Sequence, residues 1–146
     1  MLSSNSFQII HASWEQDCKR IMMIRKIVFV EEQKVSLKEE MDNLDEQCWF
    51  VLAVSEHGNN IGTGRLLPTG KIGRLAVLKD YRNQGIGSAL LKELIQIGRT
   101  QAIFPLYLHG QTHAKKFYNK HGFIEEGKVF NEAGIPHIKM RLNWKH

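Results

Sequence analysis

Apolar residues near the start of the chain change from an alternating to a helical spacing. SFQIIHAS alternates loosely between apolar and polar residues, as a strand does. Apolar side chains then recur every three or four positions from Trp14 to Val28, which predicts an amphipathic helix extending to about Phe29. The following segment, EEQKVSLKEEMDNLDEQ, has seven acidic residues against two lysines. We expect a loop or a short irregular helix there.

Longer apolar runs predict the centre of a sheet. CWFVLAV is typical of a strand buried on both faces. NIGTGRLLP follows the turn EHGNN as the second strand of a hairpin, and KIGRLAVL predicts a third. A helix with one apolar face begins near Ile86. It is followed by the strand PLYLHG, the short helix THAKKFYNKH ending at Gly122, and two closing strands, GFIEEGKVF and GIPHIKMRLNW.

The order of these elements predicts one α/β domain spanning residues 1–146, a mixed sheet with helices packed on its faces. A chain of 146 residues fits a single domain, and 42% hydrophobic with 24% charged residues is a globular balance. The N-terminus lacks a signal-peptide pattern, and no apolar run approaches the roughly 20 residues of a membrane span. We therefore expect a soluble cytoplasmic protein without membrane contact.

The two cysteines, Cys18 and Cys48, are isolated from each other and from any metal-binding spacing. Such cysteines are typical of buried thiols in a reducing compartment. We expect no disulfide framework, no metal site and no catalytic thiol.

The net charge of +5 is unevenly distributed along the chain. Residues 1–70 carry 7 Lys/Arg against 10 Asp/Glu, whereas residues 71–146 carry 13 against 5. A basic half is compatible with nucleic acid or with a phosphate-bearing small molecule. No helix-turn-helix, RNA-recognition or zinc pattern is present, so we expect no nucleic-acid partner.

The acidic stretch 31–46 has a net charge of −5 and leaves two interpretations open. It is either a rim that attracts a cationic acceptor or a solvated mobile loop.

The segment RLAVLKDYRNQGIGSALLKELI carries the sharpest chemical signal. A strand leads into a loop containing Arg82, Gly85 and Gly87, and that loop opens directly into a helix. Glycines let a ligand approach the backbone, while the free N–H groups and dipole of the helix N-terminus favour an anion such as pyrophosphate. A plain strand–loop–helix turn is the alternative. The pattern is neither a dinucleotide fingerprint nor a Walker loop.

At this point the sequence resembles the GNAT superfamily of N-acetyltransferases. R-x-x-G-x-G after a strand ending L-A-V is similar to that family's coenzyme A pyrophosphate loop. AKKFYNKHGF, residues 114–123, resembles its A-x-x-F-Y-x-K-x-G-F segment. The segments RKIVFVEEQ, Glu40-x-Asp42-x-x-Asp45 and GIPH at 134–137 resemble the ElaA-type branch.

This resemblance implies a mostly antiparallel sheet of about seven strands with helices on both faces. It also implies that the strands around Leu75–Val77 and Leu106–Gly110 splay apart, leaving backbone groups that can bind the pantetheine arm of acetyl-CoA. A backbone N–H near Ala76 or Val77 would hold the thioester carbonyl. The expected coenzyme contacts are Leu75, Ala76, Val77, Arg82, Asn83, Gln84, Gly85, Ile86, Gly87, Ser88, Gln111 and Phe117.

The implied activity is direct transfer of the acetyl group from acetyl-CoA to a small amine-bearing acceptor. Tyr118 matches the family's tyrosine near the coenzyme sulfur, where a phenol can protonate the leaving thiolate, although a packing role beside Phe117 is the alternative. Several relatives carry a histidine or glutamate on the fourth strand, where this chain has Gly73. Glu32, His109 and His137 remain as candidate bases, with Glu32 ranked first.

A CoA-binding regulatory module without catalysis is the competing function. It would keep the loop at 82–88 but would not need Tyr118. The sequence leaves monomer and homodimer open and does not name the acceptor.

Overall fold

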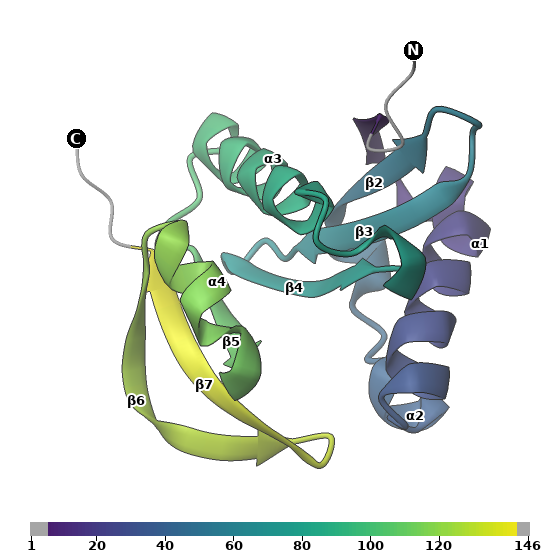
Figure 1. Cartoon of the computed structure of the whole chain (residues 1–146). Coiled ribbons are helices and arrows are strands. Elements are labelled where there is room, and N and C mark those ends of the chain that lie inside the picture. The colour runs from purple at the N-terminus through teal and green to yellow at the C-terminus, as the bar shows by residue number, and fades with distance from the viewer. Residues whose placement is uncertain (1–5, 143–146) are drawn as a thin grey trace.

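The computed structural model describes residues 6–142, which form a seven-stranded sheet with helices on both faces (Figure 1). The strands are β1 (Phe7–Ala12), β2 (Trp49–Ser55), β3 (Asn60–Leu66), β4 (Lys71–Val77), β5 (Tyr107–Gln111), β6 (Phe123–Glu132) and β7 (Ile135–Leu142). The helices are α1 (Trp14–Arg25), the π-helix η1 (Lys26–Glu32), α2 (Leu37–Glu40), α3 (Ile86–Thr100) and α4 (Lys115–Lys120). Single 3-10 turns lie at η2 (Asp45–Gln47), η3 (Lys79–Tyr81) and η4 (Thr112–Ala114).

The sheet order is β1-β2-β3-β4-β5-β7-β6. All neighbours are antiparallel except β4 and β5, which confirms the predicted mixed, mostly antiparallel sheet. The hairpin predicted around EHGNN is the β2–β3 pair. Residues 143 and 144 of the predicted last strand lie outside the described residues.

Side-chain alternation along β2 divides the core between the two faces of the sheet. Val51 and Ala53 pack with the apolar stripe of α3, whereas Phe50 and Leu52 pack with Ile21 and other side chains of α1. Successive strand residues point to opposite faces, so one fully buried strand supplies both layers. The two faces of β2 therefore fix α1 and α3 on opposite sides of the sheet.

The first helix continues further than predicted and changes its type. The α-helix ends at Arg25, and a π-helix carries the chain to Glu32, three residues beyond the predicted end at Phe29. The N–H of Gln33 donates to the carbonyl of Val28 at 3.0 Å, an i→i+5 bond. This wider turn keeps Val28 in the core and places Phe29 and Glu32 on the wall of the cavity described below.

Strands β4 and β5 pair over only two positions, Lys71 with Tyr107 and Ile72 with Leu108. Beyond these pairs the strands separate, as Figure 1 shows by the turn of β5–β7 away from β1–β4. The predicted splay is thus present.

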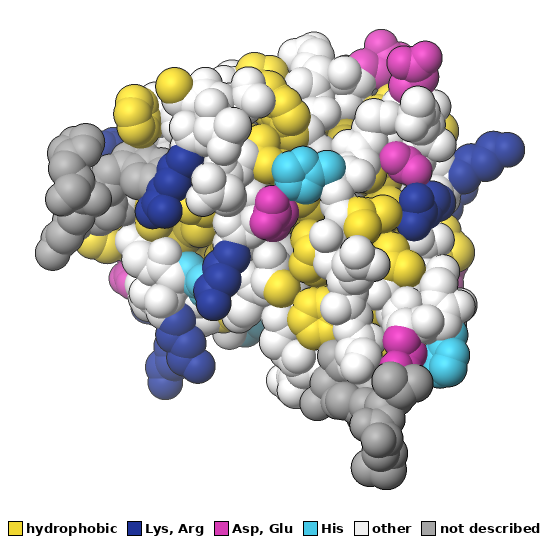
Figure 2. All heavy atoms as spheres, turned by 90° about the horizontal axis from the view of Figure 1, so that it is seen from above, with side chains coloured by type: hydrophobic (Ala, Val, Ile, Leu, Met, Phe, Trp, Pro, Cys, Tyr) yellow, Lys and Arg dark blue, Asp and Glu magenta, His cyan; other side chains and the backbone are white. Residues whose placement is uncertain are grey.

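The uneven charge along the sequence does not produce one basic surface on the face seen in Figure 2. Lys and Arg side chains there stand separately among uncharged and apolar atoms. Within residues 6–142, no helix is both long and apolar enough to cross a membrane.

Candidate active site

A cavity of about 1110 Å³ occupies the splay between β4 and β5. Its walls come from η1, β4, the loop before α3, β5, α4 and the β6–β7 turn. The sequence-predicted residues that line it are Glu32, Leu75, Ala76, Val77, Arg82, Asn83, Gly85, Ile86, Gly87, Ser88, Gln111, Phe117 and Tyr118. Segments from both ends of the chain therefore meet at one hollow.

The loop before α3 is shaped by residues in the left-handed backbone region. Asn83 has φ 64° and Gly85 has φ 83°, and Gly85 caps the helix. Asn tolerates this region and glycine enters it without steric cost. The first helical bond runs from the N–H of Ala89 to the carbonyl of Gly85, so the N–H groups of residues 86–88 are not used within the helix. They face a site suited to an anion.

Gly87 stands where the helix meets the aromatic residues of α4. A Cβ built on Gly87 would lie 3.5 Å from Cζ of Phe117, which is ordinary van der Waals contact. A larger side chain would extend into the cavity. Glycine at this position keeps side-chain atoms out of the cavity and is not needed to relieve backbone strain.

Tyr118 lies in the splay with its ring against β5. A Cβ on Gly110 would lie only 3.1 Å from Cδ2 of Tyr118, so glycine at this position makes room for the ring. Phe117 packs edge-on to Tyr118 with ring centroids 5.1 Å apart. Burial raises the pKa of Tyr118 to about 12, which keeps the phenol protonated at neutral pH. Within residues 6–142, its hydroxyl has no hydrogen-bond partner.

Arg82 and Glu32 are paired with each other across the cavity mouth. Both terminal nitrogens of Arg82 donate to the carboxylate of Glu32 at 2.6 Å, and its Nε donates to the carbonyl of Val77 at 2.9 Å. The hydrogen bonds from Arg82 lower the pKa of Glu32. A carboxylate held this way is a weaker proton acceptor than the sequence-based hypothesis required.

Two predicted glutamines are positioned less directly. Gln84 does not line the cavity, and its Nε2 donates to the carbonyl of Asp80 at 3.5 Å. Gln111 lines the cavity, and its Nε2 donates to Oε1 of Gln33 at 2.9 Å. The second contact links β5 to the end of η1.

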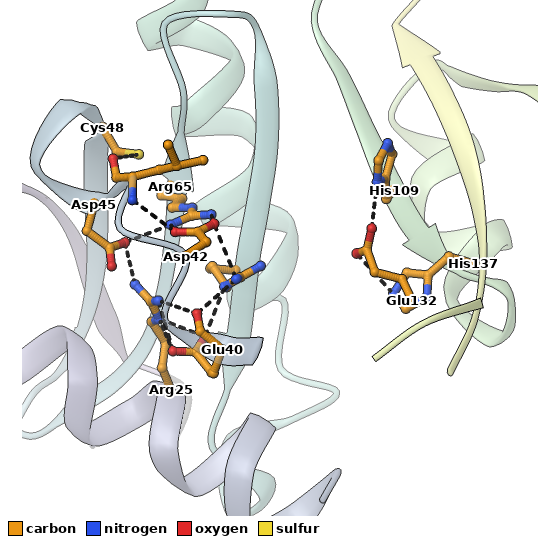
Figure 3. Close-up of polar contacts among 11 residues, drawn as sticks. Arg25, Glu40, Asp42, Asp45, Cys48, Arg65, His109, Glu132 and His137 are labelled. Carbon is orange, nitrogen blue, oxygen red and sulfur yellow. Dashed lines mark hydrogen bonds and ion pairs between the residues drawn. The ribbon is translucent and has the colours of Figure 1, made fainter. Parts of the chain in front are cut away.

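The centre of the acidic stretch is not a mobile solvated loop, because three of its acids are held in an ion network. Glu32 and Glu39 line the cavity, and the attraction of a cationic acceptor stays a prediction. Glu40 and Asp45 are almost fully buried, at 2% and 3% exposure, around Arg25, which is fully buried. Arg25 donates to both carboxylate oxygens of Glu40 at 3.0 and 3.2 Å and to Oδ1 of Asp45 at 2.7 Å. Glu40, Asp42 and Asp45 belong to an internal ion network that also involves Arg65 (Figure 3).

Arg65 and Arg74 complete this network from β3 and β4. Arg65 donates to Asp45 at 2.7 Å and forms a very short bond to Asp42, while Nε of Arg74 lies 2.9 Å from Oε2 of Glu40. Burial raises the pKa of Asp42, but the bond and charge of Arg65 outweigh it and bring the pKa to about 2. Three guanidinium groups thus neutralise three carboxylates where α2 meets the sheet.

A second polar cluster lies on the opposite wall of the cavity and was only partly anticipated. Nδ1 of His109 lies 2.9 Å from Oε1 of Glu132, and Nε2 of His137 lies 3.9 Å from Oε2 of the same carboxylate (Figure 3). All three residues line the cavity. The sequence named both histidines as candidate bases but missed Glu132, although it is one of only five acids in the basic half of the chain.

The cysteines lie apart from this chemistry. Both are free, and neither lines the cavity. Burial raises the pKa of Cys48 to about 11, and its Sγ lies 3.2 Å from the carbonyl of Leu44. Such a thiol is not a thiolate at neutral pH and is a poor nucleophile. Within residues 6–142, no three His, Cys, Asp or Glu side chains are arranged to hold a metal.

The comparisons with known proteins agree on one family. The model of the acetyltransferase (GNAT) domain matches residues 24–144. The chain belongs to the GNAT acetyltransferase family. It is 39% identical to YyaT of Bacillus subtilis over 132 residues, covering 86% of this chain and 88% of YyaT. It is 35% identical to the uncharacterized N-acetyltransferase YjcF of the same organism, covering 86% and 92%.

Solved structures extend this likeness to the fold. An acyl-CoA N-acyltransferase from Pseudomonas aeruginosa has a TM-score of 0.82 at 29% identity, covering 94% of this chain and 100% of its own. ElaA of Escherichia coli has a TM-score of 0.81 at 25% identity, covering 94% of this chain and 99% of its own. The resemblance to the ElaA-type branch is thereby confirmed.

This GNAT protein is accordingly an acyltransferase, and membership of the family implies use of acetyl-CoA or a related coenzyme A thioester. The residues of the expected coenzyme loop lie at the N-terminus of α3, beside the aromatic pair of α4. Other side chains that line the cavity come from η1, β5 and the β6–β7 turn.

Proposed function

We propose that this GNAT protein transfers the acetyl group of acetyl-CoA to a primary amine of a small acceptor by direct attack. The observation that carries the proposal is the short β4–β5 pairing, which opens a cavity between a helix N-terminus with free N–H groups and a protonated phenol. Acetyl-CoA fits this arrangement because it carries a pyrophosphate in its nucleotide part and a reacting thioester sulfur at its other end.

The coenzyme-binding residues follow from the cavity's lining. The N–H groups of residues 86–88 would receive the pyrophosphate, with Asn83 and Arg82 at the mouth. The unpaired edge of β4 around Leu75–Val77 would receive the pantetheine amides. A backbone N–H near Ala76 or Val77 would hold the thioester carbonyl and stabilise negative charge on its oxygen.

Tyr118 would act as the general acid. Its hydroxyl is protonated at neutral pH and lacks a competing partner among the described residues. It can therefore donate its proton to the departing thiolate. Direct transfer is favoured over an acetyl-cysteine intermediate because Cys18 and Cys48 lie outside the cavity. Two free thiols also fit a reducing compartment such as the cytoplasm.

The test is thiol release from acetyl-CoA against a panel of amines, amino sugars, amino acids and peptides. We expect thiol release with at least one amine class and a product heavier by one acetyl group on nitrogen. Calorimetry with acetyl-CoA alone provides a separate measurement of coenzyme binding. Failure to bind acetyl-CoA, acetylation of oxygen, or a trapped acetyl-cysteine after mixing with acetyl-CoA alone would contradict the proposal.

A further inference from the structure

His109 occupies a specific place at the start of the splay. It follows Leu108, the last β5 residue paired with β4, just as Gly73 follows Ile72 on β4. Ile72 and Leu108 belong to the core on the α3 face, so Gly73 and His109 lie on the opposite face. A Cβ on Gly73 would meet nothing within 4 Å. Because Gly73 has no side chain, open space remains beside the imidazole of His109 on β5.

This face of β5 lies opposite the face that carries Tyr118. Tyr118 contacts Gly110, whose neighbour His109 points to the other side of β5. Gln111, on the same face as His109, bonds to Gln33 at the end of η1. The cavity continues across this face between the two polar clusters of Figure 3. An acceptor amine in this part of the cavity would lie beside His109.

Glu132 and its neighbours hold the imidazole in one orientation. A carboxylate only accepts hydrogen bonds, so Nδ1 of His109 must be the donor in the 2.9 Å contact. This leaves Nε2 of the neutral ring as the proton acceptor. Phe130 packs edge-on to the ring, with centroids 5.1 Å apart. His137, whose Nδ1 lies 2.6 Å from the carbonyl of Ile135, flanks Glu132 from the other side.

We propose that His109, oriented by Glu132, is the general base that takes the proton of the acceptor amine. The inference rests on the proposed N-acetyltransferase function and assigns a catalytic residue to it. Glu32 is bound twice by Arg82, and Nε2 of His137 faces Glu132, whereas Nε2 of His109 is not engaged by Glu132. The base that relatives place on the fourth strand is in this chain supplied by the fifth.

The step needs no further reactant. The alkylamine enters as an ammonium ion, and Nε2 of His109 takes one of its protons, which frees the lone pair, and then releases that proton to solvent. The lone pair forms the C–N bond, and the C–S bond breaks with its electron pair on sulfur, which takes the proton of Tyr118. The nitrogen loses its second proton to solvent and solvent reprotonates the tyrosine, so the products are the amide, the coenzyme thiol and one released proton.

The test compares His109→Gln with His57→Gln, a matched change at an exposed turn histidine. The two probes are the fastest alkylamine of the panel, which is protonated at neutral pH, and hydroxylamine, which is not. We expect His109→Gln to lower kcat for the alkylamine by about 10²-fold and for hydroxylamine much less, because general-base contributions are of this order. Acetyl-CoA affinity and both His57→Gln rates should match the parent.

The pH dependence of kcat/KM provides a second measurement, which would not change if His109 had only a structural role. In His109→Gln, kcat/KM for the alkylamine should rise with pH up to the ionisation of the amine itself, because without the base only amine that is already neutral can attack. The parent should reach its plateau at a lower pH. The charged and titratable groups around His109 are Glu132, His137, Tyr107, Lys71 and Lys139, of which Glu132 is in contact. Glu132→Gln keeps the imidazole but removes the carboxylate that orients it, so it should shift the profile in the same direction and reduce kcat less than His109→Gln.

The outcomes separate this inference from the function on which it rests. A parent that does not bind acetyl-CoA or release thiol overturns the proposed function, and this inference with it. An active parent whose His109→Gln variant keeps its alkylamine rate, or loses both probes equally, overturns His109 as the base alone. Unfolding of His109→Gln would be visible in its thermal transition, and Glu132→Gln then decides through the shifted pH profile.

Discussion

Tyr118 shows how the packing of a single residue sets its protonation state. Its ring fits against Gly110 and packs with Phe117, while burial raises its pKa to about 12. The same desolvation that makes the ring a good packing element keeps the hydroxyl protonated. A packing role and the proposed proton donation are therefore compatible at this position.

Tyr118→Phe retains the ring and removes only the hydroxyl. We expect kcat to fall by about 10²-fold with nearly unchanged acetyl-CoA affinity, because the proton is donated mainly in the transition state. Tyr107→Phe is a matched control on β5, outside the cavity lining. Full kcat in Tyr118→Phe, measured where chemistry limits the rate, would mean that the residue only packs.

Glu32→Gln distinguishes the paired carboxylate from a catalytic base. The hydrogen bonds from Arg82 lower the pKa of Glu32, so the carboxylate is poorly suited to accept a proton. We expect kcat for the alkylamine to stay within about 3-fold of the parent, far from the roughly 10²-fold loss of a base. Calorimetry should show acetyl-CoA binding at least as tight, since Arg82 is released toward the phosphates. A loss of kcat with unchanged coenzyme affinity would restore Glu32 as the base.

At the scale of elements, α3 contributes both to the core and to the proposed coenzyme site. Its apolar face buries Ile86, Leu90 and Leu94 against the sheet, which fixes the axis and therefore the direction of its N-terminal N–H groups. The left-handed Gly85 begins the helix at the edge of the cavity. Burial along the helix thus positions the proposed anion site at its start.

Gly87→Val adds a branched side chain at this helix start. Phe117 already lies 3.5 Å from the position of a Cβ, so the two methyl groups of valine project into the coenzyme channel. We expect acetyl-CoA affinity to fall at least 10-fold by calorimetry while the thermal transition changes little. Thr100→Val, at the exposed far end of the same helix, should bind like the parent. Equal affinity in a folded Gly87→Val would contradict a pyrophosphate site here.

At the scale of the whole molecule, the network of three arginines and three acids joins elements from separate parts of the chain beside the cavity. Arg25 comes from α1, Arg65 from β3 and Arg74 from β4, and the acids come from the segment around α2. No two of these elements contain all six charged side chains. The network therefore fixes α1 and α2 against the sheet at one wall of the active site.

Asp45→Asn removes the carboxylate shared by Arg25 and Arg65. Both guanidinium groups are at most 3% exposed, so the change leaves buried charges without compensation. We expect a loss of about 3–5 kcal/mol in the free energy of unfolding. Glu125→Gln, in an exposed pair with Lys115, should lose about 0–1 kcal/mol. Urea unfolding measures both, and equal losses would contradict a structural role of the network.

Acid should weaken the same network. The pKa of Asp42 is about 2 in the folded protein, below the value of about 3.9 for an unfolded chain. Its stabilisation is therefore complete above pH of about 4 and is lost as the pH falls through about 2. We expect the urea midpoint of the parent to fall more on acidification than that of Asp42→Asn. Parallel acid dependence of the two proteins would show that Asp42 does not contribute.

Most strands, both long helices and the loop before α3 follow from the sequence alone. Their signals are local: apolar periodicity fixes a helix such as α3, an uninterrupted apolar run fixes β2, and glycine at 85 fixes the turn into the helix. The GNAT motifs also predict how these strands and helices are arranged, because each motif is a short continuous stretch of sequence. The π-helix escaped prediction because an i→i+5 bond leaves no distinct period in so short a segment.

Only the tertiary structure decided the roles of the charged residues. Glu40 and Asp45 look like any solvated acids until Arg25 and Arg65 are brought to them from 15 and 20 positions away. Glu32 looks like a free base until Arg82 meets it from 50 positions away, and His109 looks like a lone core histidine until Glu132 reaches it from 23. The charge state and availability of a side chain depend on such distant partners, because Coulomb interactions and desolvation act through space. Sequence determined where the chain could build an acetyltransferase site, and folding determined which of its acids and histidines remained available for chemistry.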